Sequence, residues 1–124
     1  MFRINEDKSI YLTRGDVANI GITAKNADGG QYTFKAGDIV RLQVFKRKDC
    51  SDVVLSKSVE VKEETTEVEI YLDQNDTKFG ELINKPTNYW YEVELNPDRM
   101  PQTIIGYDDE GEKVLTLYPE GGEM

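Results

Sequence analysis

The stretch NYWYEVEL, residues 88–95, decides the fold class because its side chains change character at every second position. The alternate positions form two sets of residues that face opposite ways. One set is Tyr89, Tyr91, Val93 and Leu95, and the other is Trp90, Glu92 and Glu94. Successive side chains of a β-strand point to opposite faces, so one face lies on a core and the other meets water. This pattern is typical of antiparallel sheets.

The same period of two recurs in four other segments, 18–24, 40–44, 59–61 and 68–72. Turn-forming residues separate them, as in Asp28-Gly29-Gly30 and Asn96-Pro97-Asp98. Seven to nine short strands are therefore expected, and they predict an all-β fold, an immunoglobulin-like antiparallel β-sandwich. A small barrel is the alternative. Two hairpins are predicted, over 58–72 and 103–118, and at most one short helical turn within 73–83, where Gly80 interrupts the helical pattern.

The length of 124 residues predicts one domain, residues 1–118, followed by a loose C-terminal tail, residues 119–124. Hydrophobic residues make up 38% of the chain, and no segment approaches the ~20 apolar residues that a membrane-spanning helix needs. The first twelve residues lack the apolar core of a signal peptide, so we expect synthesis in the cytoplasm and no membrane association.

The chain has no histidine and one cysteine, Cys50. This composition excludes zinc sites of the usual Cys/His type and catalytic triads that use histidine. We therefore predict a protein that is not an enzyme, with no catalytic residue, cofactor or metal site. The basic neighbours Arg47 and Lys48 favour a lowered pKa for the Cys50 thiol. Because no histidine or second cysteine accompanies it, Cys50 is interpreted as a loop or strand-end residue.

The formal net charge is −9, which disfavours binding to nucleic-acid phosphates. The 24 acidic residues are interleaved with 15 basic ones, whereas a protein that mimics nucleic acid needs an unbroken acidic face. The acidic segment 108–112 lacks the ligand spacing of an EF-hand calcium loop and is interpreted as a solvated hairpin tip. Asn75-Asp76-Thr77 fits the N-glycosylation pattern, but a turn between strands is the favoured interpretation.

Two Gly-Asp pairs, Gly15-Asp16 and Gly37-Asp38, each stand directly before an alternating segment. Glycine adopts positive φ at a strand entrance, and aspartate binds nearby backbone N–H groups. Both pairs are predicted to be strand-entry turns. The first also completes Arg14-Gly15-Asp16, a tripeptide known as a cell-adhesion signal, but the turn is the favoured interpretation here.

Trp90 is the candidate binding residue because the alternation puts it on the outer face, with Tyr89 and Tyr91 behind it on the core side. An exposed tryptophan is suited to a protein interface or to stacking on a sugar ring. The alternative is that the sheet is covered on both faces at this point, or that a bulge turns Trp90 inward.

The segment SIYLTRGDVANIGITAKNADGGQYTFKAGDIVRLQVF, residues 9–45, resembles the N-terminal domain of baseplate upper proteins from phages and prophages of Gram-positive bacteria. The strands KSVEVKEETTEVEIYL, residues 57–72, and NYWYEVEL extend the resemblance over most of residues 9–118. Many members of that family continue into a long trimeric stalk with a receptor-binding module, which the sequence to Met124 does not include.

The resemblance implies an immunoglobulin-like sandwich that docks in a phage tail or baseplate, as a component or a free-standing adaptor, with no catalytic residues. Its partners would be other phage structural proteins, with self-association possible in addition, and its location would be the virion. Two alternatives stay open. One is an acidic inhibitor of a host defence protein that binds nucleic acid. The other is a carbohydrate-binding module built on Trp90, which needs a second exposed aromatic residue close by.

Overall fold

The computed structural model describes residues 2–5, 8–26, 28–82, 84–108 and 111–120. Over these ranges it contains nine strands and one 3₁₀ turn. The elements are β1 (Phe2–Ile4), β2 (Ile10–Thr13), β3 (Ala18–Ile22), β4 (Ile39–Phe45), β5 (Val53–Glu60), β6 (Val68–Leu72), η1 (Asp76–Lys78), β7 (Thr87–Leu95), β8 (Gln102–Ile105) and β9 (Val114–Tyr118). The chain is all-β, as predicted, and η1 is the short helical turn expected within 73–83. No helix in these ranges is long and apolar enough to cross a bilayer.

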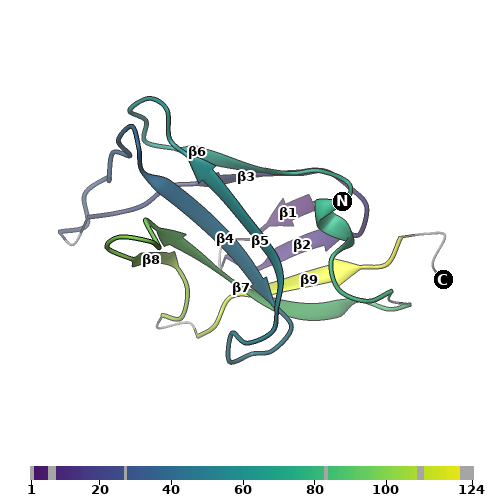
Figure 1. Cartoon of the computed structure of the whole chain (residues 1–124). Helices are drawn as coiled ribbons and strands as arrows, with labels where there is room; N and C mark the ends of the chain where they lie inside the picture. The colour runs from purple at the N-terminus through teal and green to yellow at the C-terminus, as the bar shows by residue number, and fades with distance from the viewer. Residues whose placement is uncertain (1, 6–7, 27, 83, 109–110, 121–124) are drawn as a thin grey trace.

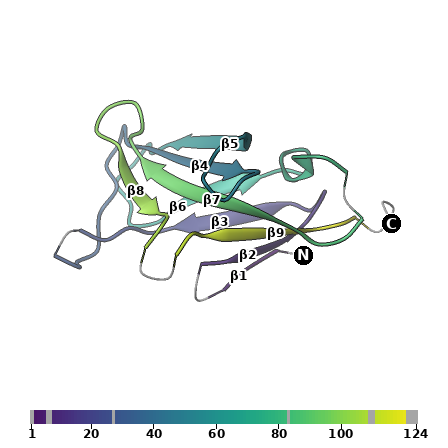
Figure 2. The same cartoon turned by 90° about the horizontal axis from the view of Figure 1, so that it is seen from below.

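The strands form two sheets (Figures 1 and 2). The larger sheet has the order β1-β2-β9-β7-β4-β5, with β8 also paired to β7, and the smaller sheet contains β3 and β6. The prediction of a wholly antiparallel arrangement is wrong in one place, because β2 and β9 are parallel, with Ile10 opposite Leu115. Parallel neighbours need a long crossover, and here the crossover is the chain from β3 to β8.

The predicted hairpin over 58–72 is wrong. β5 pairs with β4, and β6 pairs with β3 in the other sheet. The chain leaves the large sheet at Val61, which is buried and whose N–H donates to the Asp38 carbonyl at 2.8 Å. The segment between the strands then bridges to Phe34 through Thr65. Alternation predicted both strands, but it carries no information about which partner each strand takes.

The predicted hairpin over 103–118 is also wrong. β8 and β9 both run antiparallel to β7, at successive positions along one edge: Leu95 lies opposite Gln102, and Trp90 lies opposite Val114. Asp108 and Gly111 exchange backbone hydrogen bonds in the turn between the two strands. The acidic tip residues 109 and 110, part of the segment interpreted as a solvated hairpin tip, lie outside the described residues.

The core fills the space between the two sheets and draws on both. Val40, Leu42 and Val44 of β4 have no exposed surface, and neither has Ile70 of β6. Burying one such side chain contributes roughly 1.5–3 kcal/mol. Tyr89 and Tyr91 point into this core with 5% and 3% exposure, which confirms the face assigned to them.

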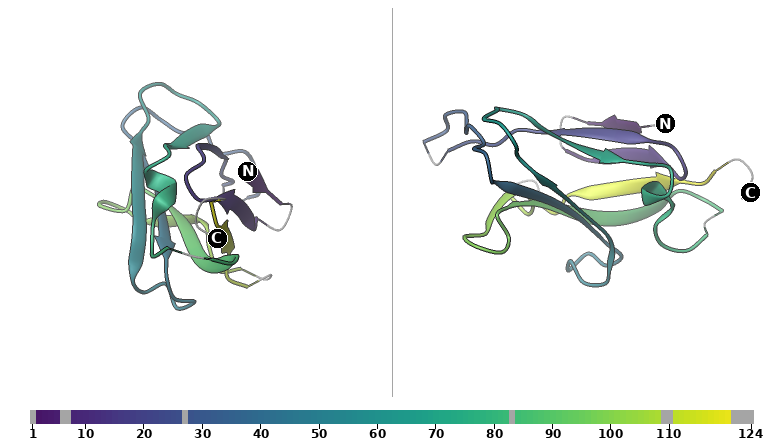
Figure 3. Two further views of the ribbon diagram at one scale, coloured as in Figure 1. Left: turned by 90° about the vertical axis from the view of Figure 1, so that its right-hand side faces the viewer. Right: turned by 45° about the horizontal axis from the view of Figure 1, so that its top comes forward.

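The first described residues, at the start of β1, and the end of β9 lie toward the end of the molecule that carries η1 (Figures 1 and 3). β8 and the segment after β3 lie at the opposite end (Figures 1 and 2). Of the predicted loose tail, 119–124, Pro119 and Glu120 are described and half-buried, and residues 121–124 lie outside the described residues.

Candidate interface surfaces

The first Gly-Asp pair is a β-turn between β2 and β3, as predicted. The Asp16 N–H donates to the Thr13 carbonyl at 3.0 Å, and Gly15 has a φ of 89°. Positive φ at the third residue of a turn, with negative φ at the second, defines type II geometry, which favours glycine at this position. The role of Gly15 is therefore conformational.

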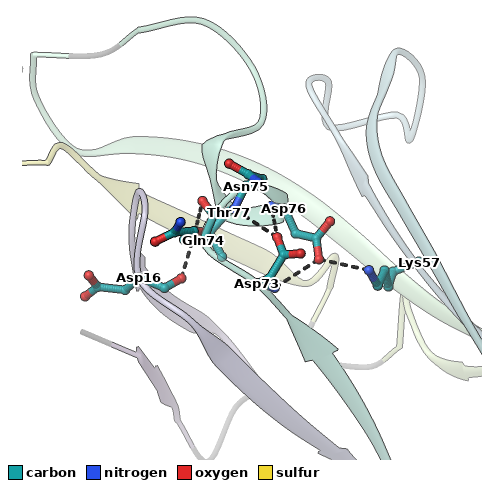
Figure 4. Close-up of polar contacts among 7 residues, drawn as sticks. All are labelled: Asp16, Lys57, Asp73, Gln74, Asn75, Asp76 and Thr77. Atoms are coloured by element: carbon teal, nitrogen blue, oxygen red, sulfur yellow. Dashed lines mark hydrogen bonds and ion pairs between the residues drawn. The ribbon is translucent and has the colours of Figure 1, made fainter.

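The side chain of Thr77, in η1, holds this turn in place through hydrogen bonds to its backbone. Its hydroxyl accepts from the Gly15 N–H at 3.0 Å and donates to the Asp16 carbonyl at 2.8 Å; Figure 4 draws the second of these bonds. Arg14 is 8% exposed, and its guanidinium donates to the Lys78 carbonyl at 3.1 Å. An adhesion ligand must present its arginine to a receptor, so the burial of Arg14 favours the structural interpretation of the tripeptide.

The segment before Thr77 is held by two carboxylates (Figure 4). Asp73 accepts from the backbone N–H groups of Asn75 and Asp76, and Asp76 accepts from Lys57 of β5 at 2.9 Å. Burial alone would raise the pKa of Asp76, but the Asp73 N–H and the Lys57 ammonium outweigh it and lower that pKa. These contacts tie β5 to η1, and they account for Asn75-Asp76-Thr77 as a turn.

The second Gly-Asp pair repeats the first. The Asp38 N–H donates to the Lys35 carbonyl at 3.0 Å, and Gly37 has a φ of 97°. The Asp38 carboxylate is buried and accepts from the Lys35 N–H, the Tyr32 hydroxyl and the Asn96 amide. Burial acts to raise the pKa of Asp38, but these hydrogen bonds and the Arg99 charge dominate and lower it. Asp38 is thus the predicted turn residue.

Trp90 lies on the outer face of β7, as predicted, and it is half-buried there. Its cross-strand neighbours on that face are Phe45 of β4 and Val114 of β9. It borders a shallow hollow of about 130 Å³, which we call the tryptophan hollow. Tyr107, 81% exposed, borders the same hollow. The remaining lining residues are Lys48, Asp49, Cys50, Tyr91, Glu92, Glu112 and Lys113.

The charged residues of this hollow are partly paired. Lys48 and Glu112 form a salt bridge of 3.2 Å across it. Burial raises the pKa of Glu92, and the charge of Glu94 adds to that effect, while Arg41 opposes it. The expected lowering of the Cys50 pKa is wrong, because burial raises it and the carboxylates of Glu92, Asp49 and Glu112 raise it further. A thiol with a raised pKa is a poor nucleophile near neutral pH.

A larger groove of about 670 Å³ opens at the end of the molecule that carries β8. One wall is a continuous run, residues 20–26, from β3 and the segment after it, and the other wall is β8. Buried side chains from other strands, among them Ile10 and Leu95, lie between the walls. Lys8 and Lys25 are the only charged residues among the described groove residues. We call this feature the β3–β8 groove.

The described residues contain no group of three or more histidine, cysteine, aspartate or glutamate side chains arranged to hold a metal ion. Trp90, the predicted interface residue, borders the tryptophan hollow on the outer face of β7. The two Gly-Asp turns lie elsewhere, directly before β3 and β4. A scan against protein-family models and searches of curated proteins and of solved structures found no match to this chain.

Two features of these surfaces were not predicted from the sequence. Tyr107 stands 17 positions from Trp90, and the turn after β8 brings it to the same hollow. The β3–β8 groove gathers residues from separate segments of the chain, so no local pattern marks it. One signal was available for the groove: 18–22 and 102–105 are strand segments without a charged residue. Exposed edge strands usually carry a charge that prevents unwanted pairing.

Proposed function

We propose that this protein is a non-enzymatic structural component of a phage or prophage particle, in the tail or baseplate, and that it works by packing against partner subunits. The observation that carries the proposal is the tryptophan hollow, where Trp90 and the exposed Tyr107 share one surface of β7 and the turn after β8. Tryptophan and tyrosine, together with arginine, are enriched among interface hot spots. The resemblance of residues 9–118 supplies the kind of particle.

The fold is compatible with this role. An immunoglobulin-like sandwich, in the broad sense of two packed sheets with chain crossings between them, is part of the proposal. This fold is supported by the four connections that cross from one sheet to the other: β2 to β3, β3 to β4, β5 to β6 and β6 to β7. Copies in a particle would be related by rotational symmetry, so the same surface of every copy would meet an equivalent partner.

The hollow has the layout of a protein interface. Its lining combines the aromatic side chains of Trp90 and Tyr107 with charged side chains such as Lys48 and Glu112, and Phe45 lies opposite Trp90 on β4. Interfaces commonly combine an apolar centre with a polar rim. Removal of a central tryptophan from such a contact typically costs ~2 kcal/mol or more of binding free energy.

Mass spectrometry of purified particles tests the proposal. We expect this protein to copurify with particles, and Trp90→Ala and Tyr107→Ala to reduce its copy number at equal expression. Tyr71→Ala is the matched control, because Tyr71 is 54% exposed on β6 of the other sheet. Absence of the wild-type protein from particles, despite expression during infection, would refute the role.

A carbohydrate-binding module is the second candidate function. The observation that favours it is Tyr107, since a sugar-binding face needs a second exposed aromatic residue near Trp90. A glycan array separates the two: binding that is lost in both Trp90→Ala and Tyr107→Ala would support sugar recognition. The acidic-inhibitor alternative has less support, because acids such as Glu94, Asp76 and Glu112 are paired with bases.

A further inference from the structure

The β3–β8 groove is bordered by two strand edges. β3 belongs to a two-stranded sheet, so among the described residues only one of its edges is paired, with β6. β8 pairs with β7 and is likewise open on its other side in the described part of the chain. Unpaired edges present backbone N–H and C=O groups that can accept another strand.

The composition of these two edges differs from that of the other outer strands. β1, β5 and β6 each carry a charge that discourages pairing with another chain, at Arg3, Lys57 and Glu69 respectively. β3 and β8 have the sequences ANIGI and QTII, with no charge and no proline. The two unprotected strands both border the same groove.

The shape and lining of the groove suit an extended peptide. Residues 20–26 form one continuous wall, of which 20–22 belong to β3. Strand and sheet spacings give roughly 160 Å³ for each residue of a packed strand. The groove volume of about 670 Å³ therefore takes about four residues. Ile104, Ile105 and Leu95 offer apolar contacts for alternate side chains of such a strand.

The charge of the groove selects the kind of peptide. The whole chain has a net charge of −9, yet the charged groups that line the groove in the described residues are Lys8 and Lys25, both exposed. The Tyr91 hydroxyl donates to the Lys8 carbonyl, which holds that residue at the groove. A bound segment with acidic residues would meet complementary charges there.

We propose that the β3–β8 groove binds an extended, acidic segment of a partner protein, which adds a strand to the free edge of β3. Main-chain hydrogen bonds to β3 would supply affinity, alternate apolar side chains would fill the groove, and acidic residues would meet Lys8 and Lys25. This inference uses a surface other than the tryptophan hollow, and it does not depend on the kind of particle.

The test is selection from a random library of displayed eight-residue peptides against the full chain. We expect enrichment of sequences that alternate apolar and polar residues and carry acidic residues. A synthetic copy of an enriched peptide should slow amide hydrogen exchange over 18–23.

The charge of the groove is tested with variants. The double variant Lys8→Glu/Lys25→Glu should bind the enriched peptide about tenfold or more weakly, because two charge contacts are lost and reversed. The control Lys46→Glu/Lys62→Glu makes the same change of net charge at exposed lysines outside the groove and should bind normally.

Three results would overturn the proposal. The first is that the selection enriches no peptide, or enriches basic ones. The second is that the two double variants bind the peptide equally well. The third is that the bound peptide slows amide hydrogen exchange at a strand other than β3. Dimerisation of the chain that the Lys8→Glu/Lys25→Glu variant abolishes, without peptide binding, would assign the groove to a second copy instead. Because Trp90 does not line the groove, we expect normal peptide binding by Trp90→Ala, which keeps this test separate from the test of the particle role.

Discussion

Replacement of Thr77 by valine tests how the first Gly-Asp turn is held. Valine has nearly the shape of threonine, so packing around this fully buried side chain is kept while the hydroxyl is lost. The Gly15 N–H and the Asp16 carbonyl then lose the partner that they have at 3.0 and 2.8 Å. Leaving a buried polar group without a partner costs about 1–3 kcal/mol. Both groups here are only partly buried, so each should cost an amount in the lower part of that range. For the two groups together, the expected loss of unfolding free energy is therefore about 2–3 kcal/mol.

Thr77→Ser is the matched variant, because it keeps the hydroxyl and removes a methyl group, at a cost of about 1 kcal/mol. Urea unfolding followed by the fluorescence of Trp90, the single tryptophan, measures both variants. With a urea dependence of roughly 1–2 kcal/mol/M, the valine variant should unfold at a urea concentration lower by about 2 M. A valine variant as stable as the serine variant, or more stable, would refute the reasoning.

Three further predictions concern charge and backbone. The lowered pKa values of Asp38 and Asp76 mean that both carboxylates stabilise the fold above their unfolded pKa of about 4 and lose this effect as pH falls through their folded values. Asp38→Asn should therefore lower the unfolding free energy at pH 6 and reduce its decline between pH 5 and 3; an unchanged decline would contradict this. The raised pKa of Glu92 means that its charged form opposes folding, so Glu92→Gln should stabilise the protein at pH 7 and do so less at pH 4. Calorimetry at the two pH values measures the difference, and destabilisation at pH 7 would be the contrary result. Gly37→Ala should cost about 1–2 kcal/mol, because no atom lies within 4 Å of the added Cβ and the strain comes from the positive φ alone; an unfolding curve like that of the wild type would contradict it.

Local pattern predicted the strands well where one face is buried. β6 and β7 alternate buried and more exposed side chains as 68–72 and 88–95 indicated, since a core on one side imposes a period of two. The two Gly-Asp turns were also predictable, because positive φ and local carboxylate hydrogen bonds depend on neighbouring residues. β1 has three residues and gave no such signal.

Strand pairing could not be predicted in the same way. A strand such as β5 alternates whether its partner is β4 or β6, so adjacency in sequence suggested a hairpin that the fold does not contain. The candidate surfaces are non-local for a similar reason: Trp90 meets Tyr107 only because β8 and β9 follow one another along β7. The direction of the Cys50 pKa shift was predicted wrongly because burial of the thiol, the largest cause, and the charges of Glu92 and Glu112 depend on the fold, whereas the bases Arg47 and Lys48 are visible in the sequence.

Hydroxyl-radical footprinting of the protein in purified particles, compared with the free protein, tests the packing role most directly. We predict that Trp90 and Tyr107 are oxidised much less in particles, while Tyr71 on the other sheet is oxidised to a similar extent in both samples. Equal oxidation of Trp90 and Tyr107 in particles and in free protein would contradict the claim that the tryptophan hollow is the contact surface.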